Sequence, residues 1–444
     1  MIFINPYNFV RVHDPVREHS SKSLSRVAGF SGEIGCRLRA ITPLVVPAIR
    51  RGSTLGVPLD PQKRPFVPGA AVRGMVRSLF ETLSCSCDPS SPEHCKEPSS
   101  CCLACRVFGR IAEEDAQGGL LRFTDAIGEP SILEPVDILL PREEGPRRHH
   151  RPFYYDDQRN PRGRKFYFHH APRPDEWEPG STSTRIRNWI RRDSELKFRI
   201  QFANLDEGDL LTLLYALVLE PGLGHKLGHG RPLGLGSCAI ELDPEETRLE
   251  SAPEIPGGLF MDFRHQGTVL PKDDLDDLVL AARNRLSEHP FLKETLEDVR
   301  IVLRLPGHQP GHMQGIPVRY PSRAWFWYDR RSVRKWPLPT LQDISGNRGM
   351  LSESPVGRVL RINLGVKWEG KEVLAPDEEE VALRLPDGEM TFSMADFNEV
   401  LDDQLPEDLR TFIFNHTLLV EVTQQDPLRG RIRGIENYQQ YKTD

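Results

Sequence analysis

Residues 65–83 read PFVPGAAVRGMVRSLFETL, and residues 102–109, at the end of a cysteine-rich stretch, read CLACRVFG. In the first segment apolar residues recur at three- and four-residue spacing, which predicts an amphipathic helix packed on a core. The apolar residues of this stripe are Val72, Met75, Val76, Leu79 and Phe80. Arg73 and Arg77 lie on another face, so the predicted helix has a basic edge.

The turn before this helix, Pro68-Gly69, is followed by two small residues, Ala70 and Ala71. The free amides and the dipole of a helix N-terminus favour an anion, so a phosphate is expected there. The alternative is an ordinary surface helix whose arginines are only solvated.

Six of the eight cysteines fall within 21 residues: Cys85, Cys87, Cys95, Cys101, Cys102 and Cys105. The chain has neither an apolar N-terminal signal nor a long apolar run, which predicts a cytoplasmic protein with reduced thiols. Clustered thiolates there are typical of a structural zinc site, and the C-x-x-C of Cys102 and Cys105 supplies two ligands. For the other two we expect Cys87 and Cys95, with Cys85, Cys101 or His94 as substitutes. Free thiols and an iron-sulfur cluster remain as alternatives.

The chain has 444 residues and a net charge of −6, which predicts two or three domains and gives no overall sign of nucleic-acid binding. The charge is uneven, because residues 147–173 hold eight Lys or Arg and two acids. Aromatic triplets flank an Asn-Pro-Arg-Gly turn at 160–163, which predicts a β-hairpin with a basic tip. Cations beside aromatic rings suit single-stranded nucleic acid, whereas the alternative is a solvated loop.

The remaining pattern predicts a strand over 194–203, a helix over 206–219, and a glycine-rich loop over 222–237 that leads into a strand over 238–242. The loop carries Lys226, His229 and Arg231, and it matches neither a Walker A loop nor a dinucleotide fingerprint. Its alternative reading is a structural turn. With the first helix, this order predicts an α+β fold with a ferredoxin-like (RRM-like) β-α-β-β-α-β core and long insertions.

Several of these segments resemble the RAMP superfamily of CRISPR-associated proteins, in particular the Cas-seven-like backbone subunits of type III effector complexes. The segments are VPGAAVRGMVRSLFE at 67–81, CLACRVFG at 102–109 and HGRPLGLGS at 229–237. In addition, INPYNFV at 4–10, RGRKFYFHH at 162–170 and VRYPS at 318–322 resemble a less-studied RAMP branch.

The resemblance implies a prokaryotic subunit that binds guide (CRISPR) RNA and target RNA beside other CRISPR effector subunits in antiviral defence, with no membrane and no small-molecule cofactor. The RNA-binding residues that it implies, together with the basic segment, are Arg73, Arg77, Arg164, Lys165, Tyr167, His169, Lys226, His229 and Arg231. Where the family shows hydroxyl residues after the Pro-Gly turn, this chain has Ala70 and Ala71. RNA-cleaving members place an Asp in the loop after the first strand, and the only acid of that loop here is Asp60.

Two other functions remain open. One is a metal-independent endoribonuclease that processes guide-RNA precursors by acid-base chemistry. Its weak catalytic candidates are Asp60, His149, His150, His169 and His170. The other is a protein-interaction scaffold stapled by zinc.

We expect three regions along the chain. Residues 1–245 form the RAMP core, with a zinc knuckle at 85–105, an extruded hairpin or thumb at 140–180, and the glycine-rich loop. Residues 246–350 form a mixed α/β extension, in which a helix is interrupted at Pro290. Residues 351–444 carry five strand-like segments, which predict a small β-barrel with an order similar to an OB fold.

Overall fold

The fold is taken from a computed structural model of the chain. The residues that the structure describes are 2–20, 22, 29–47, 54–87, 94–97, 99–111, 116–140, 163–174, 177, 184–251, 268–269, 272–289, 292–309, 316–319, 341, 351–352, 359–363, 372–373, 380–385, 388–393, 395, 417–425 and 428–436. His149, His150 and the expected hairpin tip at 160–162 lie outside this part of the chain.

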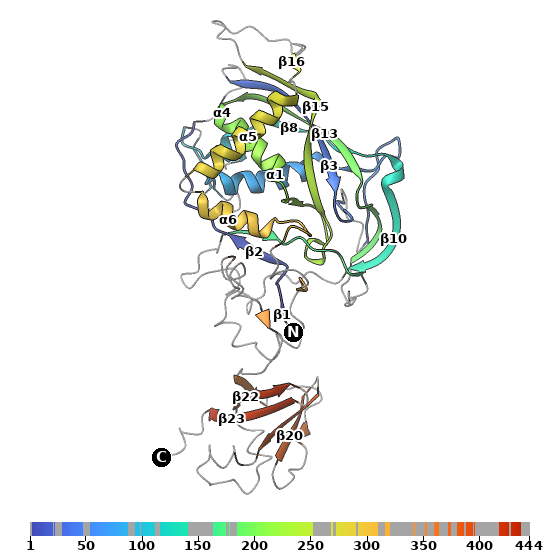
Figure 1. Cartoon of the computed structure of the whole chain (residues 1–444), viewed down its shortest axis with the longest axis vertical. Helices are drawn as coiled ribbons and strands as arrows, with labels where there is room; N and C mark the ends of the chain where they lie inside the picture. Colours follow the sequence, from blue (N-terminus) through green and yellow to red (C-terminus); the bar gives the residue numbers. More distant parts are fainter. Residues whose placement is uncertain are drawn as a thin grey trace.

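The core is built on a curled antiparallel sheet whose three long strands are β3 (Phe30–Ala40), β13 (Glu195–Leu205) and β15 (Ser237–Ser251) (Figure 1). The strand β3 lies between the other two and pairs with both. The order is β14-β15-β3-β13-β9-β5, while β8 also pairs with β13 and β16 with β15. The short strands are β5 (Phe66–Val67), β8 (Leu121–Phe123), β9 (Ala126–Ile127), β14 (His225–Lys226) and β16 (Thr268–Val269).

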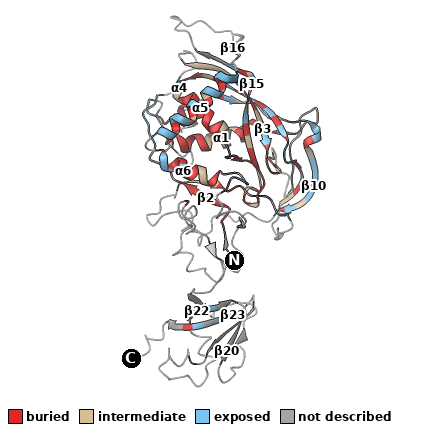
Figure 2. Ribbon diagram, in the orientation of Figure 1, coloured by how far each residue is buried: buried red, intermediate tan, exposed pale blue. Residues whose placement is uncertain are grey.

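Helices lie on one side of this sheet (Figure 1). They are α1 (Gly69–Leu83), α4 (Glu207–Val218), α5 (Lys272–Glu288) and α6 (Lys293–Val302). Side chains alternate along β13 between exposed and buried, so one face of the strand packs against the helices. Figure 2 shows buried residues concentrated where helices and sheet meet, and exposed residues on the outer side of α5. In the described part of the chain no helix is both long and apolar enough to cross a membrane.

Smaller β-structures surround the core. A three-stranded sheet joins β10 (Leu133–Leu140), β12 (Thr184–Ile190) and β4 (Thr54–Leu55). Pairs are formed by β2 (Tyr7–Val10) with β11 (Arg164–Tyr167), β6 (Arg110–Ile111) with β7 (Ala116–Gln117), and β1 (Ile2–Phe3) with β17 (Leu351–Ser352). The short helices are α2 (Leu103–Phe108) and the 3-10 turns η1 (Pro130–Ile132) and η4 (Arg231–Leu233).

The C-terminal strands form a separate six-stranded sheet in the order β18-β22-β23-β21-β20-β19. Its strands are β18 (Val359–Asn363), β19 (Glu372–Val373), β20 (Glu380–Leu385), β21 (Gly388–Ser393), β22 (Thr417–Gln425) and β23 (Leu428–Glu436). Each of the five predicted strand segments overlaps one of these strands, namely β18, β20, β21, β22 and β23. The OB-like barrel stays a prediction.

The predicted helices and strands of the core are confirmed: the helix after the Pro-Gly turn is α1, the strand over 194–203 is β13, the helix over 206–219 is α4, and the strand over 238–242 opens β15. The helical segment around Pro290 forms two helices: α5 ends at Glu288, and α6 begins at Lys293. The observed fold class is therefore mixed α+β. The strand β11 pairs with β2, so the part of the expected hairpin that the structure describes pairs with the N-terminal segment.

Candidate functional site

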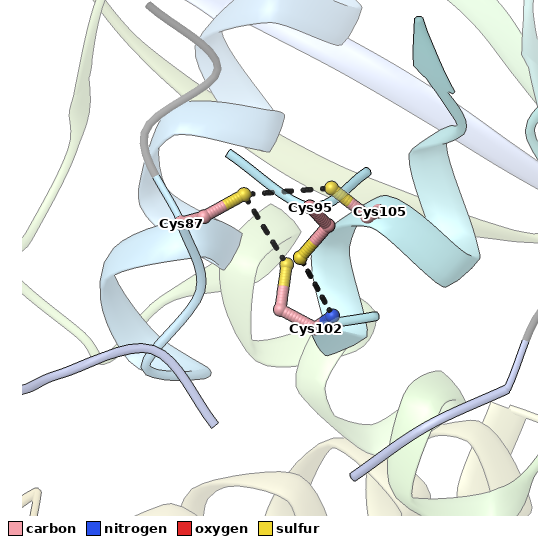
Figure 3. A group of neighbouring side chains, drawn as sticks. All are labelled: Cys87, Cys95, Cys102 and Cys105. Carbon is pink, nitrogen blue, oxygen red and sulfur yellow. Dashed lines mark hydrogen bonds between the residues drawn. The ribbon is translucent and has the colours of Figure 1, made fainter. Parts of the chain in front are cut away.

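Four buried cysteines lie together (Figure 3). They are Cys87, Cys95, Cys102 and Cys105, and their sulfur atoms all lie within 4.8 Å of one another. The Sγ of Cys87 lies 3.5 Å from that of Cys105 and 3.6 Å from that of Cys102. Four sulfurs around a tetrahedral zinc, at about 2.3 Å from it, are separated by about 3.8 Å. The cluster could therefore hold a metal ion of this kind.

Local structure explains how the four cysteines come together. Cys87 follows the end of α1, Cys102 is the N-cap of α2, and Cys105 lies one turn into that helix. The Cys102 backbone N–H donates to the Sγ of Cys95 at 3.2 Å. Hydrogen bonds among these thiols lower the pKa of Cys102 and raise those of Cys87 and Cys105, so a single thiolate is favoured among the three.

The two other cysteines of this stretch, Cys85 and Cys101, have a different role. The backbone N–H of Val16 donates to the carbonyl of Cys85, and His19 forms an antiparallel bridge with Cys101. The N-terminal segment around residues 16–19 therefore lies along the cysteine knuckle (residues 85–105).

Ion pairs fasten the knuckle to the core. In α2, Arg106 pairs with the fully buried Asp209 of α4 at 2.5 Å, and Asp209 also completes a capping box with Asp206. From β11, Arg164 donates to the carbonyl of Cys87 at 2.9 Å and pairs with Glu81 at 2.6 Å. Glu81 is buried in α1. Neither Asp209 nor Glu81 was among the expected site residues.

The predicted RNA-binding residues Arg77 and Arg164 thus converge on the same carboxylate. Arg77 pairs with Glu81 at 2.7 Å, one helical turn away. The i,i+4 spacing of Arg77 and Glu81 allowed this ion pair to be predicted from the sequence. The pairing of Glu81 with Arg164 from β11 could be found only from the structure. Arg73 donates to the carbonyl of Phe108, and both Arg73 and Arg77 lie over the Phe108 ring.

The N-terminus of α1 is occupied differently from the expectation. Asp125, between β8 and β9, accepts a hydrogen bond from the Gly69 backbone N–H at 2.7 Å. A Cβ at Gly69 would lie 2.6 Å from the carbonyl oxygens of Phe123 and Thr124. The Pro-Gly turn therefore permits close contact with the neighbouring chain segment, and a carboxylate occupies the place where a phosphate was expected.

A second group of predicted residues comes together at the β2–β11 pair. Lys165 Nζ lies 3.8 Å from the ring centre of Tyr7, and the guanidinium of Arg231 lies 4.8 Å from that of Tyr167. We call these four residues the cation-aromatic cluster. Both tyrosines are buried, so their rings support the two cations and are not open platforms for a base.

Three of the segments that carry the family resemblance meet beside this cluster. The strands β2 and β11 come from INPYNFV and RGRKFYFHH, with Tyr7 opposite Tyr167. Ile4 forms a parallel bridge with Val318, the first residue of VRYPS. These segments are far apart in sequence, and the fold places them side by side.

The glycine-rich loop packs against the protein itself. A Cβ at Gly228 would lie 2.3 Å from the Val45 carbonyl oxygen, and one at Gly236 would lie 2.0 Å from that of Leu227. Lys226 is buried, donates to the Leu235 carbonyl at 2.9 Å, and has its pKa lowered to about 7 by burial. The backbone N–H of His229 donates to the Val45 carbonyl. The loop and Lys226 thus have a clear structural role.

Of the catalytic candidates, the structure describes Asp60, His169 and His170, and each of the three bonds to other parts of the protein. His169 is fully buried, donates through Nε2 to the Gly224 carbonyl at 3.1 Å, and has its pKa lowered well below the ordinary value by burial. Burial also lowers the pKa of His170 to about 4. Asp60 accepts hydrogen bonds from the backbone and side chain of Arg64 within one turn.

The described part of the chain thus combines a mixed α+β core, a knuckle with a cysteine cluster and a second site rich in cations. Residues 37–239 match the family model of the RAMP superfamily. This match runs from Arg37 within β3 to Ala239 near the start of β15 and supports a RAMP relationship for this part of the core. A search of curated proteins found no match.

Proposed function

We propose that this protein is the guide-RNA-binding subunit of a type III-like CRISPR ribonucleoprotein, in the manner of Cas-seven-like backbone subunits. It holds guide RNA and its target duplex through cations, and it assembles beside other effector subunits. The support is the RAMP match over the core together with the strand order β15-β3-β13-β8 and the helices α1 and α4, which suit a ferredoxin-like core.

The observation that carries the proposal is the cation-aromatic cluster. Lys165 and Arg231 come from distant segments, and they lie 5.0 Å and 4.8 Å from the ring centre of Tyr167. Cations fixed in this way contact RNA phosphates with little loss of side-chain entropy. The thumb at 140–180, the three-region division and the contacts of Arg73, Arg77 and His229 are parts of the same proposal.

In this proposal the cysteine cluster holds a structural zinc ion through Cys87, Cys95, Cys102 and Cys105. The four sulfurs leave no open position for a substrate, so the ion would fix the knuckle against α1 and α4. Its contribution to RNA binding is indirect.

The test is co-purification of RNA with the chain expressed beside a CRISPR transcript. We expect repeat-containing RNA with the wild type, and an affinity about tenfold lower or worse for Lys165→Glu/Arg231→Glu, because two cations become repulsive to phosphate. The matched control is Arg192→Glu/Lys293→Glu, which changes net charge equally at two exposed residues. Equal binding by both double variants, or no RNA with the wild type, contradicts the proposal.

A further inference from the structure

A cavity of about 410 Å³ opens between α1, the cysteine knuckle and the β6–β7 pair. Three arginines line it: Arg73 and Arg77 from α1, and Arg110 from β6. Among the described lining residues there is no acid, and the nearby Glu81 is already shared by Arg77 and Arg164. The described part of the cavity wall is therefore cationic.

Arg73 and Arg77 are held in place by bonds that leave donors for a ligand. Arg73 donates through Nη2 to the Phe108 carbonyl, and Arg77 donates through Nε to Glu81. A guanidinium has five N–H donors. Burial and the neighbouring charge of Arg77 lower the pKa of Arg73, and an anion between the two groups would relieve that repulsion.

The other wall of the cavity is apolar and open. Ile111 is 82% exposed, and the space around Gly118 is empty, since a Cβ there would meet no atom within 4 Å. Next to it, both polar side-chain atoms of Gln117 are buried without a hydrogen-bond partner in the described part of the chain. The volume falls within the range of about 300–1,000 Å³ for pockets that bind organic ligands, which is far more than a bare phosphate needs.

We propose that this cavity binds one nucleotide of an RNA strand, with the phosphate on Arg73 and Arg77 and the ribose and base against Ile111 and Gly118. The inference rests on the proposed function and adds a single-nucleotide pocket at the knuckle. A nucleotide fits because it joins an anion to a flat, largely apolar ring whose edge can bond a side-chain amide. To reach the base, the amide of Gln117 turns about its side-chain torsions.

The test fills the pocket without touching a charge. Gly118→Leu places a side chain in the cavity, where the Cβ has room and the backbone is not in the left-handed region. Gly74→Leu is the matched control, because Gly74 is an exposed residue of α1 outside the cavity lining and a Cβ there also meets no atom within 4 Å. We expect Gly118→Leu to bind RNA about fivefold or more weakly, the value of one lost base contact, and Gly74→Leu to bind as the wild type.

A second readout locates the contact. RNA carrying 4-thiouridine should crosslink under ultraviolet light to the tryptic peptide 111–122, and Gly118→Leu should remove that crosslink while the others persist. Wild-type RNA binding that is unchanged in Gly118→Leu, with crosslinks only elsewhere, overturns the pocket and leaves RNA binding standing. Binding of free nucleoside monophosphate at this peptide without RNA binding also overturns the proposal, whereas absence of RNA from every preparation removes the proposed function itself.

Discussion

Individual residues in the core of this protein are polar to an unusual degree. Lys226, His169 and His225 are all buried around the glycine-rich loop, and each hydrogen-bonds to a backbone carbonyl. Carbonyl acceptors satisfy a neutral imidazole, but they do not compensate for a buried positive charge as a carboxylate does. The loop is therefore held by side chains whose protonation matters to the fold.

We expect acid to destabilise the protein through His225. Burial lowers its pKa to about 4 from the ordinary 6.5, so its neutral form stabilises the fold above pH 6.5 and this contribution is lost as the pH falls toward 4. His225→Gln keeps a donor for the Leu217 carbonyl. Between pH 7 and pH 4, the free energy of unfolding of this variant should fall by about 3 kcal/mol less than that of the wild type.

Urea denaturation at several pH values measures this difference. His13→Gln, at an exposed histidine, is the control and should follow the wild-type pH dependence. An identical acid dependence of His225→Gln and wild type would show that His225 is not the group responsible.

The four cysteines that the structure brings together could be predicted from the sequence, because a C-x-x-C and its neighbours are close in the chain. Tyr167, Lys226 and His169 were expected at an RNA-binding surface, whereas the structure buries all three. Their burial depends on β2, on the glycine loop and on residues after 300, which no local pattern links to them. Tyr7 and Arg110 were missed for the same reason.

At the scale of elements, α1 connects α2, β11 and the turn between β8 and β9. Its apolar stripe packs on the core, its Glu81 binds two arginines, and its N-terminus meets Asp125. The helix itself could be predicted from the spacing of its apolar residues. The hydrogen bond between its N-terminus and Asp125 could not, since Asp125 lies 56 residues further along the chain.

We expect Asp125→Ala to lower the free energy of unfolding by about 1 kcal/mol, the value of a helix cap, without lowering RNA affinity. The variant removes a negative charge from a place that attracts anions, so any change in RNA affinity should be an increase. Glu129→Ala, an exposed acid nearby, is the control and should change stability by less than about 0.5 kcal/mol. Weaker RNA binding by Asp125→Ala alone would contradict this role.

At the scale of the whole molecule, the cysteine knuckle joins the N-terminal segment, α1, α4 and β11. Its contacts include the His19–Cys101 bridge, the Arg106–Asp209 ion pair and the bond from Arg164 to Cys87. Metal binding at such a junction is coupled to folding.

We expect one zinc ion per chain and a loss of roughly 10 °C in the thermal unfolding midpoint on chelation. Cys102→Ser should lose the metal. Cys101→Ser should keep it, because this neighbouring and equally buried cysteine lies outside the group of four. Elemental analysis of the purified variants decides the point, and equal metal content in the two would refute the assignment of ligands.

The position of β3 in the sheet determines when the core can fold during synthesis on the ribosome. This early strand lies between β13 and β15, so both of its edges wait for segments made more than 150 residues later. The knuckle, in contrast, closes within 87–105 and can form while synthesis continues. A nascent chain that ends before residue 195 can therefore have its four cysteines together while both edges of β3 are unpaired. Unpaired strand edges are prone to pair with other chains.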